Sequence, residues 1–150
     1  MSTIGSLVDA RPVFSVQLDA KVVDAVRVMA EKNVGALAVL EGSLLVGIFS
    51  ERDVVTRVVA KQLDPRIVPV KDVMTKQLVV ADAAESDEAC LRKMKGANCR
   101  HLPIVSGDKL VGMISLRDLL LAGLTERDEK LEYLTSYLFH LSPDAGQKSQ

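Results

Sequence analysis

The stretch LVGIFSERD, from Leu45 to Asp53, returns 65 residues later as LVGMISLRD, from Leu110 to Asp118. Six of the nine positions are identical. Sliding the whole sequence by 65 positions aligns residues 14–55 with residues 79–120 without a gap, and 11 of the 42 pairs are identical. The identities gather at glycines and apolar positions, so the chain contains an internal repeat. Two copies predict a pair of similar modules rather than a solenoid, which needs at least three.

Each copy carries the same order of predicted elements. Two apolar stretches flank a Gly-centred turn, EGS or SGD, which is typical of a hairpin. A further short strand and a helix precede the hairpin, and a serine opens a second helix after it. The order in each copy is therefore β-α-β-β-α, which predicts an α/β fold. The strands are expected at 13–16, 36–40 and 44–49 in the first copy and at 78–81, 102–105 and 109–114 in the second.

Apolar spacing predicts which faces the helices bury. The helix before each hairpin has an apolar stripe with helical spacing, formed by Val22, Val26 and Met29 in the first copy and by Cys90, Met94 and Ala97 in the second. The helix after each hairpin has an apolar side that we expect to lie in a homodimer interface, because an exposed apolar face is unfavourable on a monomer. The residues of that side are Val54 and Val58 in the first copy and Leu119 and Leu120 in the second.

The polar segment KQLDPR at 61–66 contains Asp-Pro and predicts a linker. The expected domains are 1–66, the first repeat with an N-terminal segment and the linker; 67–124, the second repeat; and 125–150, a C-terminal helix and a polar tail. Leu131, Leu134 and Leu138 form an apolar stripe on that last helix. The stripe either covers the module's own apolar edge or contacts a second copy of the chain.

Composition excludes several classes of function. The 150 residues are 48% apolar and 26% charged with a net charge of -1, which is typical of a soluble globular domain and predicts no affinity for nucleic acid. No apolar run reaches the roughly 18 residues of a membrane helix, and MSTIGSLVDA is not a signal peptide, so we expect a cytoplasmic protein. Cys90 and Cys99 are expected to be buried thiols, and their spacing from His101 suits no zinc site.

The longest matching stretches are DAVRVMAEKNVGALAVLEGSLLVGIFSERD in the first repeat and VKDVMT, continued by CLRKMKGANCRHLPIVSGDKLVGMISLRD, in the second. These stretches resemble a tandem pair of CBS (cystathionine β-synthase) domains. The resemblance covers about residues 8–123. It implies two repeats packed sheet to sheet about a pseudo-twofold axis, adenine nucleotides or related adenosyl ligands bound in clefts between the repeats, and dimers shaped like flat discs.

The repeated Gly-x-x-Ser-x-x-Asp motif has two interpretations. Ser50 with Asp53, and Ser115 with Asp118, each form the pattern of a helix capping box, which is a purely structural role. In a nucleotide site the aspartate accepts the two hydroxyls of a ribose, while Arg52 and Arg117 donate to phosphate. Capping explains the serine and the aspartate but not the recurrence of glycine and arginine with them, so we expect nucleotide binding at one or more sites.

In the family the adenine lies against the first strand and the strand after the long helix. The matching residues are Ser15, Val16, Leu37 and Ala38 in the first repeat and Val80, Ala81, Leu102 and Pro103 in the second. Each of Val16, Leu37, Val80 and Leu102, taken singly, also fits an ordinary core position.

A basic pair distinguishes the two repeats. Arg100 and His101 match a family pair that contacts ligand phosphates, whereas the first repeat has Gly35 and Ala36 at the aligned positions. The alternative is a solvated arginine and a half-buried histidine at the end of a surface strand. Either way, two sites of equal affinity are not expected.

We expect a cytoplasmic, homodimeric sensor without a fused catalytic domain. It would bind AMP, ADP or ATP without a metal ion, and a change of conformation would act on a protein partner. An NAD or S-adenosyl ligand is an alternative because it shares the adenosine half. A ligand-free interaction scaffold is another. The sequence contains no nucleophile–base pattern and no Walker sequence, so we do not expect an enzyme.

Overall fold

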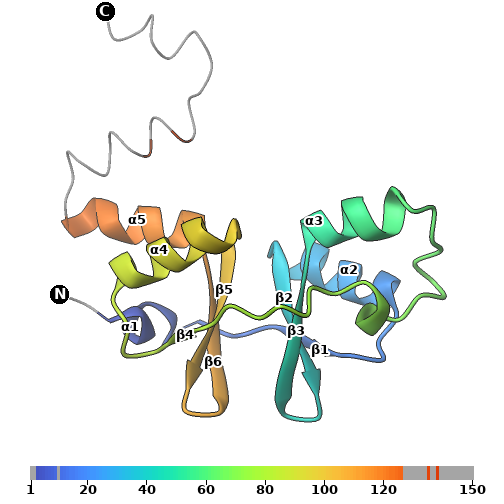
Figure 1. The fold of residues 1–150 in the computed structure, drawn as a ribbon, viewed down its shortest axis with the longest axis horizontal. Coiled ribbons are helices and arrows are strands. Elements are labelled where there is room, and N and C mark those ends of the chain that lie inside the picture. Colours follow the sequence, from blue (N-terminus) through green and yellow to red (C-terminus); the bar gives the residue numbers. More distant parts are fainter. Residues whose placement is uncertain (1–2, 10, 127–134, 136–137, 139–150) are drawn as a thin grey trace, which may run out of the picture. The chain divides into compact units, whose positions relative to one another are not determined.

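The structure is a computed structural model, and it describes residues 3–9, 11–126, 135 and 138, without the side chains of 124–126. Two three-stranded sheets carry the repeats (Figure 1). The chain divides into two compact units, residues 1–114 and 115–150. No helix in the described part of the chain is long and apolar enough to cross a membrane.

The first repeat has the predicted order of elements. Strand β1 (Ser15–Gln17) runs parallel to β2 (Ala36–Glu41), and β2 pairs antiparallel with β3 (Leu44–Ser50), giving the sheet order β1-β2-β3. Helix α2 (Val22–Lys32) connects β1 to β2. After β3 the chain forms α3 (Glu51–Asp53), which continues as η1 (Val54–Val59), a π-helix.

The second repeat has the same plan. Strand β4 (Ala81–Asp82) runs parallel to β5 (His101–Ser106), and β6 (Lys109–Ser115) completes the sheet order β4-β5-β6. Helix α4 (Asp87–Ala97) lies between β4 and β5, and α5 (Leu116–Glu126) follows β6. The predicted β-α-β-β-α order is therefore confirmed in both repeats. The expected first strands were too long, since only 15–17 and 81–82 pair with a neighbour.

Positive backbone angles mark corresponding turns in the two repeats. Asn33 ends α2 with φ 55° and Asn98 ends α4 with φ 53°, both in the left-handed region that asparagine tolerates. Gly42 and Gly107, with φ 63° and 61°, turn the two hairpins. Two of the eleven identities between the repeats, Asn33 with Asn98 and Gly42 with Gly107, thus serve chain reversal rather than ligand binding.

One face of the first sheet holds a core. Buried Val22, Ala25 and Met29 of α2 pack with Leu37 and Val39 of β2 and with Phe49 of β3. Val58 of η1 completes this cluster with Val70, Val73 and Met74, which lie in residues 60–80, the connection from η1 to β4 that is longer than the predicted 61–66 and is called the linker from here on. Burying side chains of this size stabilises the fold by about 1.5–3 kcal/mol each. The second predicted stripe is correct at Cys90 and Met94 but wrong at Ala97, which is exposed at the end of α4.

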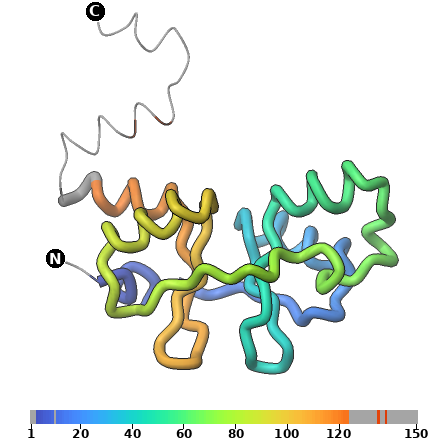
Figure 2. Tube along the Cα trace, in the orientation of Figure 1, coloured from blue at the N-terminus to red at the C-terminus, as the bar shows by residue number. Residues whose placement is uncertain are grey.

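The segment that precedes each repeat in sequence docks on the other repeat. Helix α1 (Ile4–Val8) donates from Ile4 N to the carbonyl of Glu85, and from Gly5 N to that of Ala83, both in the second repeat. The 3-10 helix η2 (Val70–Asp72) in the linker donates from Val70 N to the carbonyl of Ala20 in the first. Figure 2 traces the linker from η1 to β4. The two docking arrangements are equivalent, as a pseudo-twofold relation between repeats requires.

The motif glycines accommodate these docked segments. A Cβ on Gly47 would lie 2.5 Å from Met74 Sδ and 3.0 Å from the carbonyl oxygen of Thr75. A Cβ on Gly112 would lie 2.7 Å from Val8 Cβ. A glycine in a strand lets another group approach the backbone closely. The approaching group is the protein's own chain.

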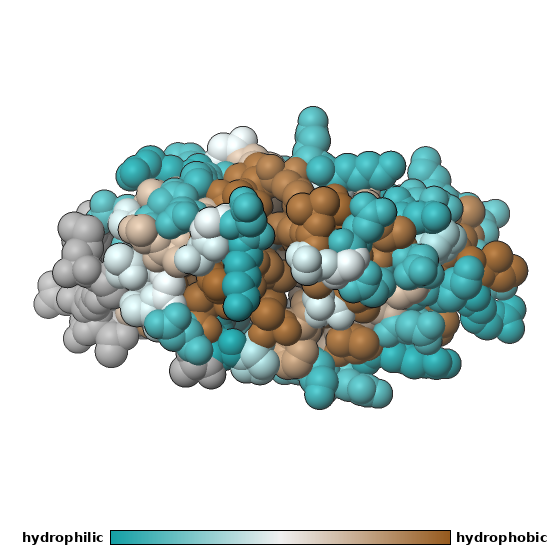
Figure 3. Space-filling model, turned by 90° about the horizontal axis from the view of Figure 1, so that it is seen from below, coloured by the Kyte–Doolittle hydropathy of each residue, from teal (hydrophilic) through white to brown (hydrophobic). Residues whose placement is uncertain are grey.

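The expected dimer face is wrong at three of its four residues, and the fourth, Val54, is half-buried against the core. Val58, Leu119 and Leu120 are buried within the chain, with 1%, 6% and 4% of their surface exposed. The outward residues of η1 are instead Val55 and Val59, which are 60% and 66% exposed. On the opposite face, seen from below, Figure 3 shows apolar side chains gathered toward the middle with polar ones around them. The sequence correctly indicates an apolar helix, but periodicity alone does not show which edge of the stripe packs inward. Most of the predicted C-terminal helix, including Leu131, Leu134 and Tyr137, lies outside the described residues.

Candidate functional site

The first motif forms a complete capping box. The backbone N–H of Asp53 donates to Ser50 Oγ at 3.3 Å, and the backbone N–H of Ser50 donates to Asp53 Oδ2 at 3.0 Å. Ser50 adopts the extended conformation of an N-cap residue, so its side chain can meet the first free N–H groups of α3. The structural interpretation of Ser50 and Asp53 is confirmed.

Asp53 is buried and has partners beyond the cap. It is 4% exposed, and among the described residues no other charged side chain is buried. The hydroxyl of Thr75 lies 3.1 Å from Oδ1 and 3.3 Å from Oδ2, and Arg57 Nε lies 3.6 Å from Oδ1. A buried carboxylate is costly unless charges and donors compensate it, and these residues supply both.

The second motif repeats the reciprocal cap. Ser115 N donates to Asp118 Oδ2 at 3.0 Å, and Asp118 N donates to Ser115 Oγ at 3.0 Å. Asp118 is half-buried rather than buried. The position 65 residues after Arg57 is Ala122, which has no donor in its side chain. The two motifs thus share the cap but differ in the residue one turn along.

Both motif arginines are exposed, and one of them has a partner in the other repeat. Arg52 Nη1 lies 3.3 Å from the carbonyl oxygen of Asn98, the residue that ends α4. A cation at a helix C-terminus interacts favourably with the helix dipole. The guanidinium of Arg52 retains further donors for a ligand, since it carries five N–H groups.

One member of the basic pair of the second repeat, His101, lies beside the first motif. A Cβ on Gly35 would lie 3.1 Å from His101 Nε2 and 3.6 Å from Glu51 Cδ. His101 is half-buried, Arg100 is exposed, and Gly35 accepts a hydrogen bond from Glu51 N. The absence of a side chain at Gly35 therefore admits the imidazole to the start of α3. Any phosphate that His101 contacts would belong to a ligand of the first motif.

The predicted adenine strands are brought together in the first repeat. Ser15 pairs with Ala38 and Val16 with Val39 in the parallel register of β1 and β2. Because β1 is an edge strand, its outer backbone groups face away from this pairing. In the second repeat Ala81 pairs with Ile104, the residue after Pro103. In each repeat the two strands that carry the predicted adenine contacts are therefore neighbours in the sheet.

Several predicted adenine contacts have no accessible surface. Leu37, Ala38, Ala81 and Leu102 are 0% exposed, and Pro103 is fully buried. Ser15 is exposed, while Val16 and Val80 are half-buried. The core interpretation fits the fully buried residues in this conformation. Their contact with an adenine ring stays a prediction, and it would need local movement.

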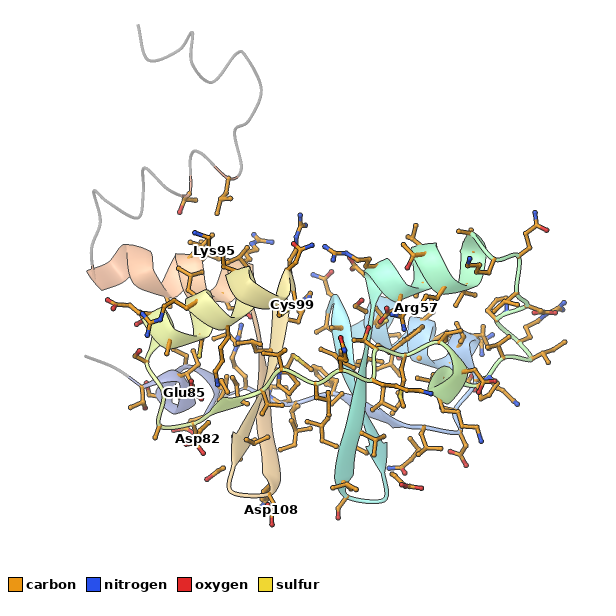
Figure 4. The ribbon with its side chains drawn as sticks, viewed as in Figure 1. Arg57, Asp82, Glu85, Lys95, Cys99 and Asp108 are labelled. Atoms are coloured by element: carbon orange, nitrogen blue, oxygen red, sulfur yellow. The ribbon has the colours of Figure 1, made fainter. Side chains whose placement is uncertain are left out.

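In the second repeat, Lys93 already forms a hydrogen bond with Val80, one of the predicted adenine contacts. Its Nζ donates to the backbone carbonyl of Val80 at 2.8 Å and to Glu85 Oε2 at 2.8 Å. The bond from Lys93, followed by the backbone N–H of Asp82, lowers the pKa of Glu85 below its ordinary value. Figure 4 labels Glu85 and Asp82 next to one another near β4. The sequence pattern did not predict the ion pair between Lys93 and Glu85.

The cysteines have the character of structural thiols. Burial raises the pKa of Cys90, which is fully buried, and that of Cys99, which is half-buried. A raised pKa disfavours the reactive thiolate. Within the part of the chain that the structure describes, no three His, Cys, Asp or Glu side chains gather in a way that could hold a metal ion.

Two site residues were missed from the sequence, Thr75 and Arg57. Repeat comparison selects positions that are the same in both copies, and these two are not. Residue 122, which stands 65 positions after Arg57, is alanine, and both Arg57 and Thr75 lie outside the aligned ranges. The sequence VMT next to the linker was part of the resemblance, but nothing in its spacing connects Thr75 with Asp53.

The comparisons with known proteins agree with this architecture. The CBS domain model matches residues 4–60 and 70–124. The mitochondrial CBS domain-containing protein CBSX3 of Arabidopsis thaliana is 30% identical over 125 residues, 80% of this chain and 61% of the relative. A CBS-domain structure from Burkholderia ambifaria, described as a signal-transduction protein, has a TM-score of 0.79 at 31% identity and covers 84% of this chain and 96% of its own.

A third similarity shows the fold alone. The CBS domain pair of MJ0100, solved with 5′-methylthioadenosine and S-adenosyl-L-methionine, has a TM-score of 0.75 at 18% identity and covers 85% of this chain and 99% of its own. The chain spans less than two thirds of CBSX3 and 20% of the plant relative CBSCBSPB5, which is 33% identical over 110 residues.

Proposed function

The chain belongs to the CBS-domain family, and we propose that it is a regulatory module that binds an adenine nucleotide, AMP, ADP or ATP, at its Ser-x-x-Asp motifs. CBS-domain pairs are regulatory and signalling modules. We further propose that the module has no catalytic activity of its own, that it acts on a protein target and that it lies in the cytoplasm.

The observation that carries the proposal is the pairing of an aspartate with an exposed arginine in both motifs. Asp53 and Asp118 supply carboxylate acceptors for ribose hydroxyls. Arg52 and Arg117 stand one residue before them and are exposed, so each guanidinium can form parallel bonds to a phosphate. A nucleotide carries both a ribose diol and a phosphate, so it offers a partner to each kind of side chain.

The location of the basic pair supports a phosphate-bearing ligand at the first motif. His101 lies within 3.1 Å of the point where a Gly35 side chain would begin, and Arg52 reaches Asn98 near it. Arg100 is exposed next to His101. The first motif therefore has a basic side chain of the second repeat beside it, which its own repeat does not encode.

An S-adenosyl ligand is the second candidate, and Glu51 favours it. This carboxylate stands at the start of α3 beside His101, where the second motif has Leu116. A negative charge there opposes a polyphosphate and complements a sulfonium or ammonium group. MJ0100 was solved with 5′-methylthioadenosine and S-adenosyl-L-methionine, and its fold is shared.

We also propose that the chain forms a homodimer, through the exposed side of η1 rather than through the buried residues predicted from the sequence. Val55 and Val59 present two large apolar side chains on adjacent turns of η1, and both are more than half exposed. Association with a second copy of the chain would remove them from water and stabilise the dimer.

Calorimetric titration with AMP, ADP, ATP, NAD, S-adenosylmethionine and adenosine tests the function. We expect saturable binding of at least one phosphate-bearing adenine nucleotide and a rise in melting temperature with its concentration, because the ligand binds only the folded chain. Binding of S-adenosylmethionine alone would select the second candidate. Binding of none would favour an interaction scaffold. Fractionation of cells that express the chain tests the cytoplasmic location.

A further inference from the structure

Four groups surround the carboxylate of Asp53: three donate hydrogen bonds to it, and the fourth is an ion-pair partner. An ionised carboxylate offers about four lone-pair sites. Oδ2 accepts from Ser50 N at 3.0 Å and from Ser50 Oγ at 3.2 Å. Oδ1 accepts from Thr75 Oγ1 at 3.1 Å and faces Arg57 Nε at 3.6 Å. A ribose that binds here must replace some of these donors.

The donors differ in how easily they can leave. The Ser50 N–H is fixed by the cap at the end of β3. The other two groups are the side chains of Thr75, a linker residue, and of Arg57, which lies on η1 and donates a hydrogen bond to the linker. Thr75 pairs with Ile48 of β3 through two backbone bonds of 2.9 Å and 3.0 Å, and Arg57 Nη1 donates to the carbonyl oxygen of Met74 at 2.7 Å. Figure 4 shows Arg57 between the helix that begins with α3 and the linker.

We propose that Thr75 and Arg57 act as a latch, in which they occupy the acceptor sites of Asp53, so that a ribose diol binding at the first motif must displace Thr75 and thereby loosen residues 74–75 of the linker from β3. This inference rests on the proposed function, since it assumes that Asp53 meets a ribose. It adds the means by which occupancy reaches the linker. It also makes Thr75 and Arg57 determinants of affinity at the first motif.

The latch predicts a coupling in both directions, because linkage between two equilibria is reciprocal. Ligand at Asp53 should weaken the Thr75–Ile48 pairing, and weakening that pairing should strengthen ligand binding. An ordinary ligand would have the opposite effect on the linker, since binding usually stabilises nearby structure. The sign of the change therefore distinguishes the latch from simple stabilisation.

The binding experiment uses adenosine, which has the diol and no phosphate, in a chain where Asp118→Ala has removed the second acceptor. Thr75→Val keeps the shape of the side chain and removes its donor. We expect it to bind adenosine about five- to tenfold more tightly, as for the loss of one competing hydrogen bond. Affinity for 2′,3′-dideoxyadenosine should stay unchanged. Thr56→Val is the matched control, because its hydroxyl donates to the Arg52 carbonyl at 2.8 Å instead. Weaker adenosine binding by Thr75→Val would overturn the latch and make Thr75 a ligand contact.

Amide hydrogen exchange tests the latch without a ligand. Thr75→Val and Arg57→Gln should each speed exchange at the amides of Ile48 and Thr75 relative to Thr56→Val and Arg66→Gln, whose guanidinium pairs with Asp64 at the surface. Adenosine added to the parent chain should speed exchange at the same amides. Unchanged exchange in both variants would overturn the latch. Faster exchange in the variants, together with no binding of adenosine or AMP to any chain, would support the attachment of the linker and refute the proposed function.

Discussion

The guanidinium of Arg52 lies 3.3 Å from the carbonyl oxygen of Asn98, so the motif of the first repeat contacts the residue that ends α4 in the second. His101, three residues further on, lies beside Gly35 in the same region. These contacts place the charge difference between the repeats at the first motif. They determine which variants should separate ligand binding from folding.

Replacing the two motif aspartates should have unequal effects on stability. Asp118→Ala removes a cap and should cost about 1 kcal/mol of unfolding free energy. Asp53→Ala also leaves Thr75 without its acceptor and Arg57 without its counterion, so we expect a loss of about 2–4 kcal/mol. Urea unfolding of the two variants measures this difference. Equal losses would mean that the extra partners of Asp53 contribute nothing.

Replacing Arg100 and His101 with Gly and Ala, which copies the first repeat, should weaken ATP binding far more than adenosine binding. Charge-assisted contacts to phosphate contribute roughly 1.5–3 kcal/mol each, and adenosine has none to lose. Calorimetry on the double variant gives both affinities, with Arg66→Ala as a control for the loss of an exposed arginine. Added salt should weaken ATP binding in the parent more than in the variant. If adenosine and ATP lose affinity equally, the pair supports the fold rather than binding phosphate.

Val55→Lys and Val59→Lys should convert the proposed dimer to a monomer. Each change places a charge on the exposed apolar side of η1 without disturbing the buried Val58. Light scattering in reducing buffer measures the mass of each variant. Leu44→Lys, at a similarly exposed residue of β3, should leave the mass unchanged. A parent chain that is monomeric at micromolar concentration would contradict the dimer itself.

Two glycine substitutions should change stability in opposite directions. Gly112→Ala brings a Cβ to 2.7 Å from Val8 Cβ, so α1 must move and the chain should lose about 1–3 kcal/mol. Gly96→Ala lies in α4 with nothing within 4 Å of the new methyl group, and it should gain up to about 1 kcal/mol. Thermal unfolding compares them. A harmless Gly112→Ala would show that α1 docks loosely.

Glu85 should contribute to stability in a pH-dependent manner. Its pKa is lowered in the folded chain, chiefly by the bond from Lys93, so the folded state keeps this carboxylate charged to a lower pH than the unfolded state does. The contribution is fully present above the ordinary pKa of 4.5 and is lost as the pH falls through the lower folded value. Lys93→Met should therefore reduce the stability at pH 6 and flatten its decline in acid. Denaturation at a series of pH values measures both effects, and an unaltered slope in the variant would contradict the assignment.

Residues that are identical in both repeats carried most of what could be predicted. The hairpin glycines and the Ser-x-x-Asp caps depend on local backbone geometry, which a few neighbouring residues determine. Elements built from such local rules appeared in the predicted order. The first strands were misjudged because a strand of two or three residues is defined by its partner and not by its own sequence.

The sequence by itself determined the repeat, the β-α-β-β-α order and the reciprocal serine–aspartate caps, because each depends on residues close together in the chain. Only the tertiary structure decided that α1 docks on the second repeat, that η2 docks on the first, and that Thr75 and Arg57 surround Asp53. It also decided that Val55 and Val59, rather than Val58, face outward. These relationships join residues distant in sequence, and packing of the whole chain, which no local pattern encodes, brings them together.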